Sequence, residues 1–499
     1  MPMGAAPSVG RLPTSLKLTY GVGHVLNDLC ASMWFSYMLL YMHKVVTFNN
    51  VNAGFVVLAG QIADAISTPF VGLQSDKTYN VKYGRRKIWH LVGVICVTCS
   101  FPFIFHLCVG GCANAPQYAL MVYYIPFIVI FQFGWASTQI SHLSLIPELT
   151  HCQQGKVELN AIRYFATVLS NLVVFFVCFV LFELKSSKTS GNQDLESSLS
   201  IADADKFFIL ATSVVALGVF FMVIFHLFVK EPSCTKEIDS VNEEEQEHLV
   251  GGAKKPQLAQ KTVNDWFKTP VFYKVGWLYM MTRLIVNISQ VYLAYFVTET
   301  LKLNKSAIAI APAVVYVTGI FASLIAKKLN RALGLKFTYF FGLCFILAGS
   351  VYFYFMRSLD IKYRPAVYGA CVCLGLGGST LLINSLAMIS QMIGRNVDTS
   401  AFVYGSMSLL DKFSNGAAIM LIQFLHPCKD QVICCYSCQL YYRNIMSYFP
   451  GVCAVLAFLV LMTIGKNTFE NPQDMNKRTV ANTVQKTYDS SYQSTDSKY

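Results

Sequence analysis

The sequence predicts an all-α membrane protein with twelve membrane-spanning helices arranged in two six-helix halves. Of its 499 residues, 54% are hydrophobic and only 13% are charged, whereas about a quarter of the residues of a soluble domain are charged. Apolar runs near the roughly 20 residues that a helix needs to cross a bilayer recur along the whole chain. Six runs precede a long polar segment and six follow it, which is typical of an internally duplicated transporter.

The first six runs predict spans at residues 16–45, 52–74, 88–107, 118–149, 157–184 and 206–229. The second six predict spans at residues 270–301, 306–326, 337–355, 366–393, 400–425 and 447–464. The spans that begin at residues 16, 118 and 270 are longer than the bilayer requires, which tilting or projection into water absorbs. The first run is too long and too polar for a cleavable signal, so we expect it to stay as the first helix.

The polar segments divide the chain into five parts. We expect a cytosolic N-terminal segment (1–15), a first six-helix bundle (16–229), a cytosolic linker (230–268), a second six-helix bundle (269–466) and a cytosolic disordered tail (467–499). Residues 245–250 of the acidic linker resemble a dileucine sorting signal with Val250 in place of the second leucine. Sorting adaptors are therefore candidate partners, and a merely soluble acidic linker is the alternative.

The distribution of basic residues predicts the orientation. The loop after the second span contains Lys77, Lys82 and the run from Arg85 to Lys87, whereas residues 108–117 contain no Lys or Arg. Because cytosolic loops are enriched in Lys and Arg, the basic loops and both termini are expected in the cytosol. The net charge of +12 is then mostly a consequence of topology. It does not favour a nucleic-acid partner, since the basic residues are scattered over short loops.

Six cysteines fall in loops on the predicted non-cytosolic side. They are Cys108, Cys112, Cys428, Cys434, Cys435 and Cys438. In an oxidising compartment such a cluster is a disulfide framework. The alternative is a zinc site built on the Cys-Cys-x-x-Cys spacing. The predicted side favours disulfides, so no metal ligands are assigned.

Charged residues inside the predicted spans are the main functional signal. A charge at the centre of a membrane helix costs about 2.5–3.5 kcal/mol on insertion scales, so it must face protein or a water-filled cavity. The spans contain Asp28, Asp64, Arg163, Arg283, Asp411 and Lys412. Each residue alone is as consistent with a structural ion pair as with function. Charges of both signs in both halves favour a substrate cavity.

Helical spacing gathers polar residues onto one face of each of five spans. The faces contain His24, Asn27 and Asp28; Gln61, Asp64 and Thr68; Gln132, Trp135, Gln139 and His142; Arg283, Asn287 and Gln290; and Tyr404, Ser408, Asp411, Lys412 and Asn415. Five such helices can surround one polar cavity. The alternative is inter-helix hydrogen bonding at about 0.6 kcal/mol per contact, which explains single amides but not Arg or Lys. For His142 a structural role is favoured over a proton relay.

The loop between the second and third spans predicts a gate. Asp76 ends one helix, and Gly84, Arg85 and Arg86 begin the next. Such a loop can act as an electrostatic latch between two states of a carrier. The alternative is plain positive-inside topology, which requires neither the Asp nor the Gly.

Motifs of soluble enzymes are missing from the sequence. There is no Walker-type phosphate loop, no Gly-x-Ser-x-Gly and no His-Glu-x-x-His. The glycines of residues 375–378 lie inside a predicted span and indicate close helix packing rather than a dinucleotide site. We therefore predict a protein that is not an enzyme, with no catalytic residues and no cofactor.

These motifs resemble those of the major facilitator superfamily. The segment from Asp76 to Arg86 resembles its signature loop. Residues 64–66 (Asp-Ala-Ile) with Pro69, together with Asp28, Arg163 and Lys412, resemble the glycoside–pentoside–hexuronide cation symporter branch. The resemblance implies that these positions line a substrate site. The chain departs from that branch where Thr68 and Gln139 replace carboxylates, which weakens a site for a hard cation.

Longer blocks resemble one animal subfamily of that branch. The blocks are residues 24–34, 126–142, 282–287 and 401–408, together with the cysteine loop 428–438. The resemblance implies a multi-pass protein of lysosomal and melanosomal membranes that is needed for cysteine entry and influences pigmentation.

The resulting hypothesis is a carrier that imports cysteine by alternating access. Asp28 would meet the substrate ammonium, Arg163 or Lys412 its carboxylate, and Gln139 and Asn287 would supply neutral hydrogen bonds. Asp64, His142 and Arg283 complete the predicted substrate residues. Facilitated diffusion is favoured narrowly over proton exchange. The alternatives are a proton- or sodium-coupled sugar symporter and a non-transporting scaffold or receptor. The expected partners are cysteine and the lipid bilayer, with no nucleic acid.

Overall fold

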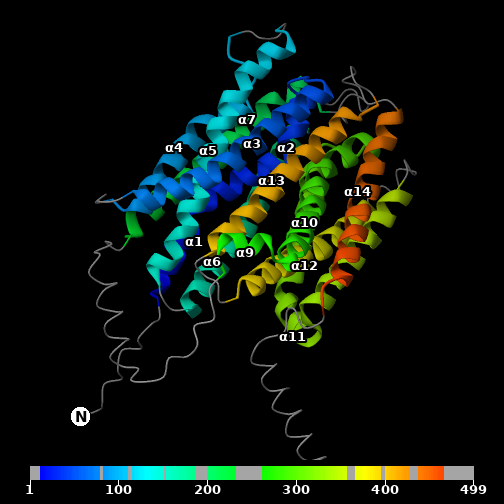
Figure 1. Cartoon of the computed structure of the whole chain (residues 1–499). Coiled ribbons are helices and arrows are strands. Elements are labelled where there is room, and N and C mark those ends of the chain that lie inside the picture. Colours follow the sequence, from blue (N-terminus) through cyan, green and yellow to red (C-terminus); the bar gives the residue numbers. More distant parts are fainter. Residues whose placement is uncertain are drawn as a thin grey trace, which may run out of the picture.

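The computed structural model describes residues 12–78, 83–110, 115–150, 153–186, 199–231, 261–356, 366–394, 399–427 and 436–465. Every regular element in these residues is a helix. The helices of the first half lie on one side of the molecule and those of the second half on the other (Figure 1). The predicted tail 467–499, most of the predicted linker and residues 1–11 lie outside the described residues.

The first half contains α1 (Thr14–Val22), α2 (Val25–Lys44), α3 (Asn50–Lys77), α4 (Arg85–Ile104), α5 (Gln117–Leu149), α6 (Gln153–Ser186) and α7 (Ala204–Phe228). A short 3-10 helix, η2 (Ile201–Asp203), leads into α7. The first predicted span is broken in two, because Gly23 and His24 end α1 and begin α2.

The second half contains α9 (Val263–Phe267), α10 (Pro270–Tyr295), α11 (Ala307–Phe355), α12 (Val367–Ile393), α13 (Ser400–Phe424) and α14 (Tyr436–Met462). A π-helical turn, η3 (Phe296–Thr300), continues α10. The element α11 comprises two predicted spans, which meet at Gly334 with φ of 81°. Glycine tolerates this left-handed backbone without a steric penalty. The helix α14 begins well before the predicted start at residue 447.

Ten helical segments of the described chain are long and apolar enough to cross a membrane. The other two long segments are α2 and α13, which contain Asp28, Asp411 and Lys412. Almost every residue of α2 is buried, so this helix is enclosed by protein and does not need an apolar surface for lipid. The predicted fold class, with twelve spanning helices in two six-helix halves, is confirmed.

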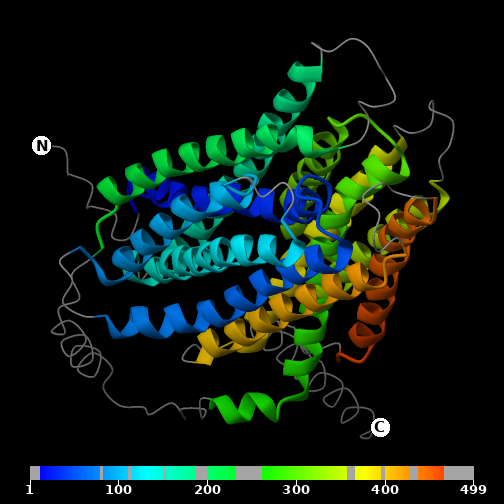
Figure 2. The same ribbon diagram turned by 90° about the horizontal axis from the view of Figure 1, so that it is seen from above.

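The two halves meet along three helix pairs. The helix α2 packs against α10, α6 against α11, and α3 against α13. In Figure 2 the blue α3 and the orange α13 run side by side. Glycines permit this close approach, since a Cβ on Gly54 would lie 2.9 Å from Gln423 and one on Gly416 would lie 2.9 Å from Leu58.

Ion pairs and hydrogen bonds join the halves at one end of the bundle. Lys44 of α2 lies 3.0 Å from Glu299 of η3, and both side chains are buried. Lys305 lies 2.8 Å from Asp203. The Asn50 amide lies 3.0 Å from His426 Nδ1. We name this end the latched end. The opposite end, where α3 ends and α4 begins with Arg85–Arg86, is named the basic end.

Candidate functional site

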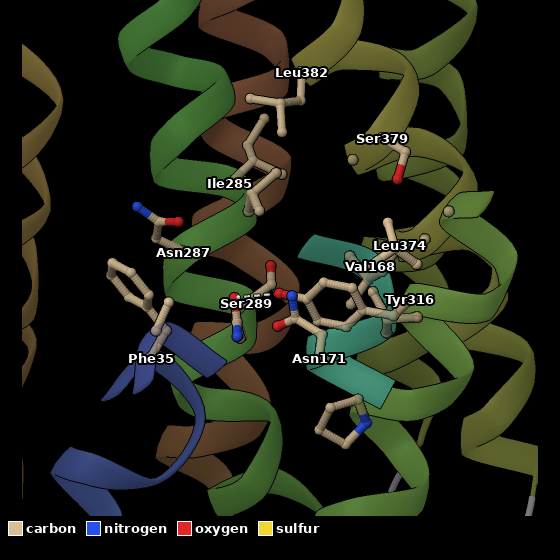
Figure 3. A pocket seen from close by; sticks show the side chains of 18 of the residues that line it. Phe35, Val168, Asn171, Ile285, Asn287, Ser289, Tyr316, Leu374, Ser379 and Leu382 are labelled. Atoms are coloured by element: carbon tan, nitrogen blue, oxygen red, sulfur yellow. Dashed lines mark hydrogen bonds between the residues drawn. The ribbon is translucent and has the colours of Figure 1, made fainter. Parts of the chain in front are cut away.

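A cavity of about 280 Å³ lies between the halves. Side chains from α2, α5, α6, α10, α11 and α12 line it. Asn171 and Tyr316 lie on its first-half and second-half walls (Figure 3), and Tyr316 Oη donates to Gln290 at 3.4 Å. Apolar side chains such as Phe35 and Leu374 fill the rest of the lining. The volume is near the roughly 300 Å³ lower limit of ordinary ligand pockets, which suits a small solute.

Asp28 is the carboxylate of this cavity. It lies one helical turn after His24, and the two side chains approach within 3.0 Å. From α6, Thr167 donates a hydrogen bond of 3.0 Å to the other carboxylate oxygen. One hydrogen bond and one close imidazole contact thus hold a carboxylate that is 5% exposed and lines the cavity. These contacts fix the position of the carboxylate at the cavity wall.

Arg163 of α6 contacts the His24 ring on the side opposite to Asp28. Its Nη2 lies 3.1 Å from His24 Nε2. Because a guanidinium only donates, Nε2 is the acceptor, and the neutral ring carries its proton on Nδ1, toward Asp28. The cavity lining contains Asp28 but not Arg163 among the residues that the structure describes.

Arg283 of α10 is the cation of the cavity. Its Nε lies 2.8 Å from an oxygen of Asp411 on α13, and Asn415 donates to the other oxygen of Asp411 at 2.8 Å. The Arg283 side chain lines the cavity and stays 24% exposed. A partly paired guanidinium with accessible surface can still bind a carboxylate, because its five donors form a fork.

Asp64 and Lys412 form a separate ion pair between α3 and α13. The Lys412 ammonium lies 2.6 Å from Asp64 and donates a second bond of 2.6 Å to Thr68. Both charged side chains are buried, and the pair lies outside the cavity lining as described. Thr68, where the resemblance in the sequence predicted an acid, is thus a hydroxyl acceptor for the lysine.

The six charged residues that the sequence places inside the spans have no net charge. Three are carboxylates and three are cations, and all lie in contact with an oppositely charged or hydrogen-bonding side chain. A buried charge without a partner is strongly destabilising, which explains the pairing. Such a site can bind a solute with no net charge and one group of each sign without leaving an excess charge in the membrane.

The remaining predicted substrate residues differ in position. Asn287 lines the cavity. Gln139 lies one turn behind the cavity and accepts a 3.1 Å hydrogen bond from Trp135, which lines it. His142 is fully buried outside the lining and stacks on Tyr20, with ring centroids 4.2 Å apart. The structure therefore brings Asp28, Arg283 and Asn287 together around one space.

Sequence reasoning missed part of the lining. Thr167, Asn171 and Tyr316 carry hydroxyl or amide groups into or beside the cavity, yet single groups of this kind occur in most spans. Thr167 and Asn171 do follow Arg163 at helical spacing, and that pattern would have marked the inner face of α6.

The predicted gating loop is held by two glutamates that the sequence did not single out. Arg85 and Arg86 donate to the same oxygen of Glu148, at distances between 2.8 and 3.2 Å. Glu231 accepts the backbone N–H groups of Arg86 and Lys87, each at 3.0 Å, and thereby caps α4. Burial raises the pKa of the Glu231 carboxyl, while these backbone donors lower it.

Gly84 fits this cap. Its φ is 109°, and a Cβ there would collide with Glu231. The Asp76 side chain lies outside the described residues, so its predicted role in the latch stays a prediction.

Of the six predicted loop cysteines, Cys108 is disulfide-bonded. Cys112, Cys428, Cys434 and Cys435 lie outside the described residues, as does the side chain of Cys438. Within the described residues, no group of three or more His, Cys, Asp or Glu side chains is arranged to hold a metal ion. The disulfide framework as a whole stays a prediction.

Comparison with known proteins agrees with this architecture. The family model described as "MFS/sugar transport protein" matches residues 19–465. Major facilitator superfamily domain-containing protein 12 of Homo sapiens is 46% identical over 469 residues, covering 92% of this chain and 95% of that protein. Its counterpart in Mus musculus is 44% identical over 91% of this chain and 94% of that protein.

Solved structures show the same fold. A crystal structure of a D-xylose-proton symporter superposes with a TM-score of 0.65 at 15% sequence identity, covering 91% of this chain and 98% of that one. With a family match over most of its length and relatives at 44–46% identity, the chain belongs to the major facilitator superfamily of membrane transporters, in the group of the proteins called domain-containing protein 12.

Proposed function

We propose that this transporter moves cysteine from the cytosol into lysosomes and melanosomes by alternating access, and thereby influences pigmentation. One observation carries the proposal: the cavity between the halves is lined by the carboxylate of Asp28 from one half and the guanidinium of Arg283 from the other. The organelle and the substrate follow from the animal subfamily that the sequence resembles.

The two charges fit the two ends of an amino acid. In the proposal Asp28 binds the ammonium and Arg283 binds the carboxylate, each as a charge-assisted hydrogen bond. Of the earlier candidates for the carboxylate, Lys412 is bonded to Asp64 and Thr68. Arg163 bonds His24 through Nη2 and lies outside the described cavity lining. Asn287 and Gln290 supply neutral bonds from the wall of α10.

The apolar part of the lining supports a small thiol side chain. Phe35 and Leu374 contribute to it, and Trp135 adds an aromatic face. A thiol is a weak hydrogen-bonding group that packs much like an apolar one and makes favourable contacts with aromatic rings.

The contacts between the halves support alternating access. In the proposal the basic end faces the cytosol, as the positive-inside rule requires, and the latched end faces the lumen. The bundles 16–229 and 269–466 would rock about the cavity, so that the contacts Lys44–Glu299 and Asp203–Lys305 separate when the lumenal side opens. The linker signal at 245–250 would direct sorting, and it lies outside the described residues.

The test is uptake by the purified protein in liposomes. The substrates are labelled cysteine, a panel of labelled sugars, and serine as the analogue that lacks sulfur. We expect saturable uptake of cysteine by the wild type. The control variant Asp205→Asn, at an exposed position, should retain this uptake, and Asp28→Asn should lose it. Uptake of sugar in place of cysteine would point to the sugar-carrier alternative, and uptake of none would point to a scaffold or receptor.

A further inference from the structure

Four histidines from four helices form a cluster between the cavity and the basic end. They are His24 of α2, His90 of α4, His142 of α5 and His226 of α7. His90 and His142 are fully buried. Alternating access by itself does not require this cluster.

The outer part of the cluster is a continuous hydrogen-bonded chain. The Tyr83 hydroxyl lies 2.7 Å from His226 Nδ1, and His226 Nε2 lies 3.0 Å from His90 Nδ1. His90 Nε2 lies 2.9 Å from the carbonyl oxygen of Gly23, at the break between α1 and α2. Tyr83 is 38% exposed, so the chain reaches the surface at the basic end.

The carbonyl fixes the direction of every bond in this chain. A carbonyl oxygen only accepts, so His90 carries its proton on Nε2 and accepts at Nδ1. His226 must then donate from Nε2, and Tyr83 must donate to His226 Nδ1. All three donors point inward. When a proton passes outward along such a chain, each group hands its outward-facing proton to the next, so that every donor afterwards points inward.

The inner part of the cluster lies between His90 and Asp28, and its rings are near one another without a hydrogen bond from His142 to His90 or His24 among the described residues. The His142 ring centroid lies 6.0 Å from that of His90 and 5.5 Å from that of His24. His142 donates from Nε2 to the Tyr20 carbonyl at 2.9 Å, and its Nδ1 is buried without a hydrogen-bond partner among the described residues. This unsatisfied lone pair lies between the outer chain and the pair His24–Asp28, where a proton in transit can bind.

A positively charged side chain lies at each end of the histidine cluster and disfavours protonation of the rings. Lys87 of α4 donates to the His226 carbonyl at 3.0 Å, and Arg163 of α6 bonds His24. The anions nearby are Asp28 on α2 and Glu231 after α7, and Glu231 is occupied by the N-terminus of α4. These cations make storage of a proton on the histidines unfavourable.

We propose that this histidine chain carries protons from Asp28 to the cytosol, and that cysteine import is exchanged for a lumenal proton. The inference rests on the proposed function and adds a driving force to it. In the lumen-open state a proton binds the Asp28 carboxylate and displaces the substrate ammonium. The empty carrier then reopens to the cytosol. Before a proton can leave, the bonds of the outer chain must reverse, so that His90 Nε2 becomes an acceptor and Tyr83 donates to water. One proton then leaves Asp28 for the inner end of the chain and one leaves Tyr83 for water, so the number of protons on the histidines is unchanged.

The experiment measures two quantities in liposomes that contain the purified protein. The first is accumulation of labelled cysteine with an acidic interior at clamped zero membrane potential, and the second is cysteine exchange at equal pH. One proton exchanged per cysteine gives about tenfold accumulation per pH unit. His90→Gln and His226→Gln are expected to abolish the accumulation and to retain the exchange. His106→Gln, a histidine outside the chain near the latched end, is expected to retain both.

Each result decides one proposal. Wild-type exchange without any pH-driven accumulation overturns the proton exchange and leaves cysteine transport standing, whereas absence of wild-type exchange overturns the transport proposal itself. Accumulation that persists in both chain variants overturns the histidine path. If both variants lose cysteine exchange together with the accumulation, the histidines have a structural role, and the histidine path is overturned in this case also.

Discussion

At the scale of single residues, each half carries one carboxylate and one guanidinium, and the helix that bears the acid in one half corresponds to the helix that bears the arginine in the other. In the first half Asp28 lies on α2 and Arg163 on α6, whereas in the second half Arg283 lies on α10 and Asp411 on α13. These are the first and fifth spans of each half in a duplicated fold. The exchange places one carboxylate and one guanidinium on opposite walls of the cavity.

The ion pair Asp64–Lys412 gives a prediction about stability. Asp64→Asn leaves a buried lysine without its carboxylate, which costs roughly 3–5 kcal/mol. We expect low abundance and a lower melting temperature of the purified protein. The double variant Asp64→Asn with Lys412→Met removes both charges and is expected to recover most of the loss. A single variant as stable as the wild type in a thermal-shift assay would contradict the structural role of the pair.

The sequence predicted the charged residues of the site better than it predicted their partners. Charge inside an apolar run is rare and costly, so Asp28 and Arg283 could be recognised without a structure. Which cation meets which anion depends on helix rotation and on pairs far apart in sequence, such as Asp64 with Lys412. The hydroxyl of Tyr316 carried no signal, because tyrosines are frequent in this chain.

At the scale of elements, the turn from α3 to α4 shows how a helix end is positioned. Gly84 turns the chain at positive φ, Glu231 caps the first N–H groups of α4, and Glu148 binds both arginines. The sequence predicted the helices and the glycine turn. It could not predict the two acids, because they come from the ends of α5 and α7, far along the chain.

This arrangement predicts that Glu148 contributes to the gate. Glu148→Gln removes charge-assisted bonds to Arg85 and Arg86, each worth about 1.5–3 kcal/mol in such settings. We expect transport to be slowed several-fold at equal expression. Glu183→Gln at the exposed far end of α6 is the control. If Asp76→Asn slows transport and Glu148→Gln does not, the latch belongs to Asp76.

At the scale of the whole molecule, the halves are joined at the latched end and enclose the cavity between them. Lys44–Glu299 and Asp203–Lys305 connect the first half to the second there. The sequence predicted two six-helix halves from the positions of the apolar runs. It did not predict which ends are joined, since the same helices must pack in at least two ways in a carrier that alternates.

The latch predicts a shift in conformation. Glu299→Gln weakens the buried bond to Lys44 and is expected to favour the lumen-open state, about tenfold for each 1.4 kcal/mol lost. Labelling of Ser289→Cys in the cavity by a membrane-impermeant thiol reagent from the latched side reports it, in a background where labelling of the native cysteines is subtracted. Faster labelling supports the latch. Labelling at the same rate as with Glu299 intact would contradict it.

The central claim is that the cavity recognises a small zwitterion between Asp28 and Arg283, and competition by two analogues in cysteine exchange tests it most directly. Cysteamine lacks the carboxylate and 3-mercaptopropionate lacks the ammonium. Each is expected to compete about 10–100-fold more weakly than cysteine, because one charge-assisted contact is lost. Arg283→Gln should remove the advantage of cysteine over cysteamine, and Asp28→Asn its advantage over 3-mercaptopropionate. Equal competition by both analogues and cysteine, or the same preferences in both variants as in the wild type, would contradict the account.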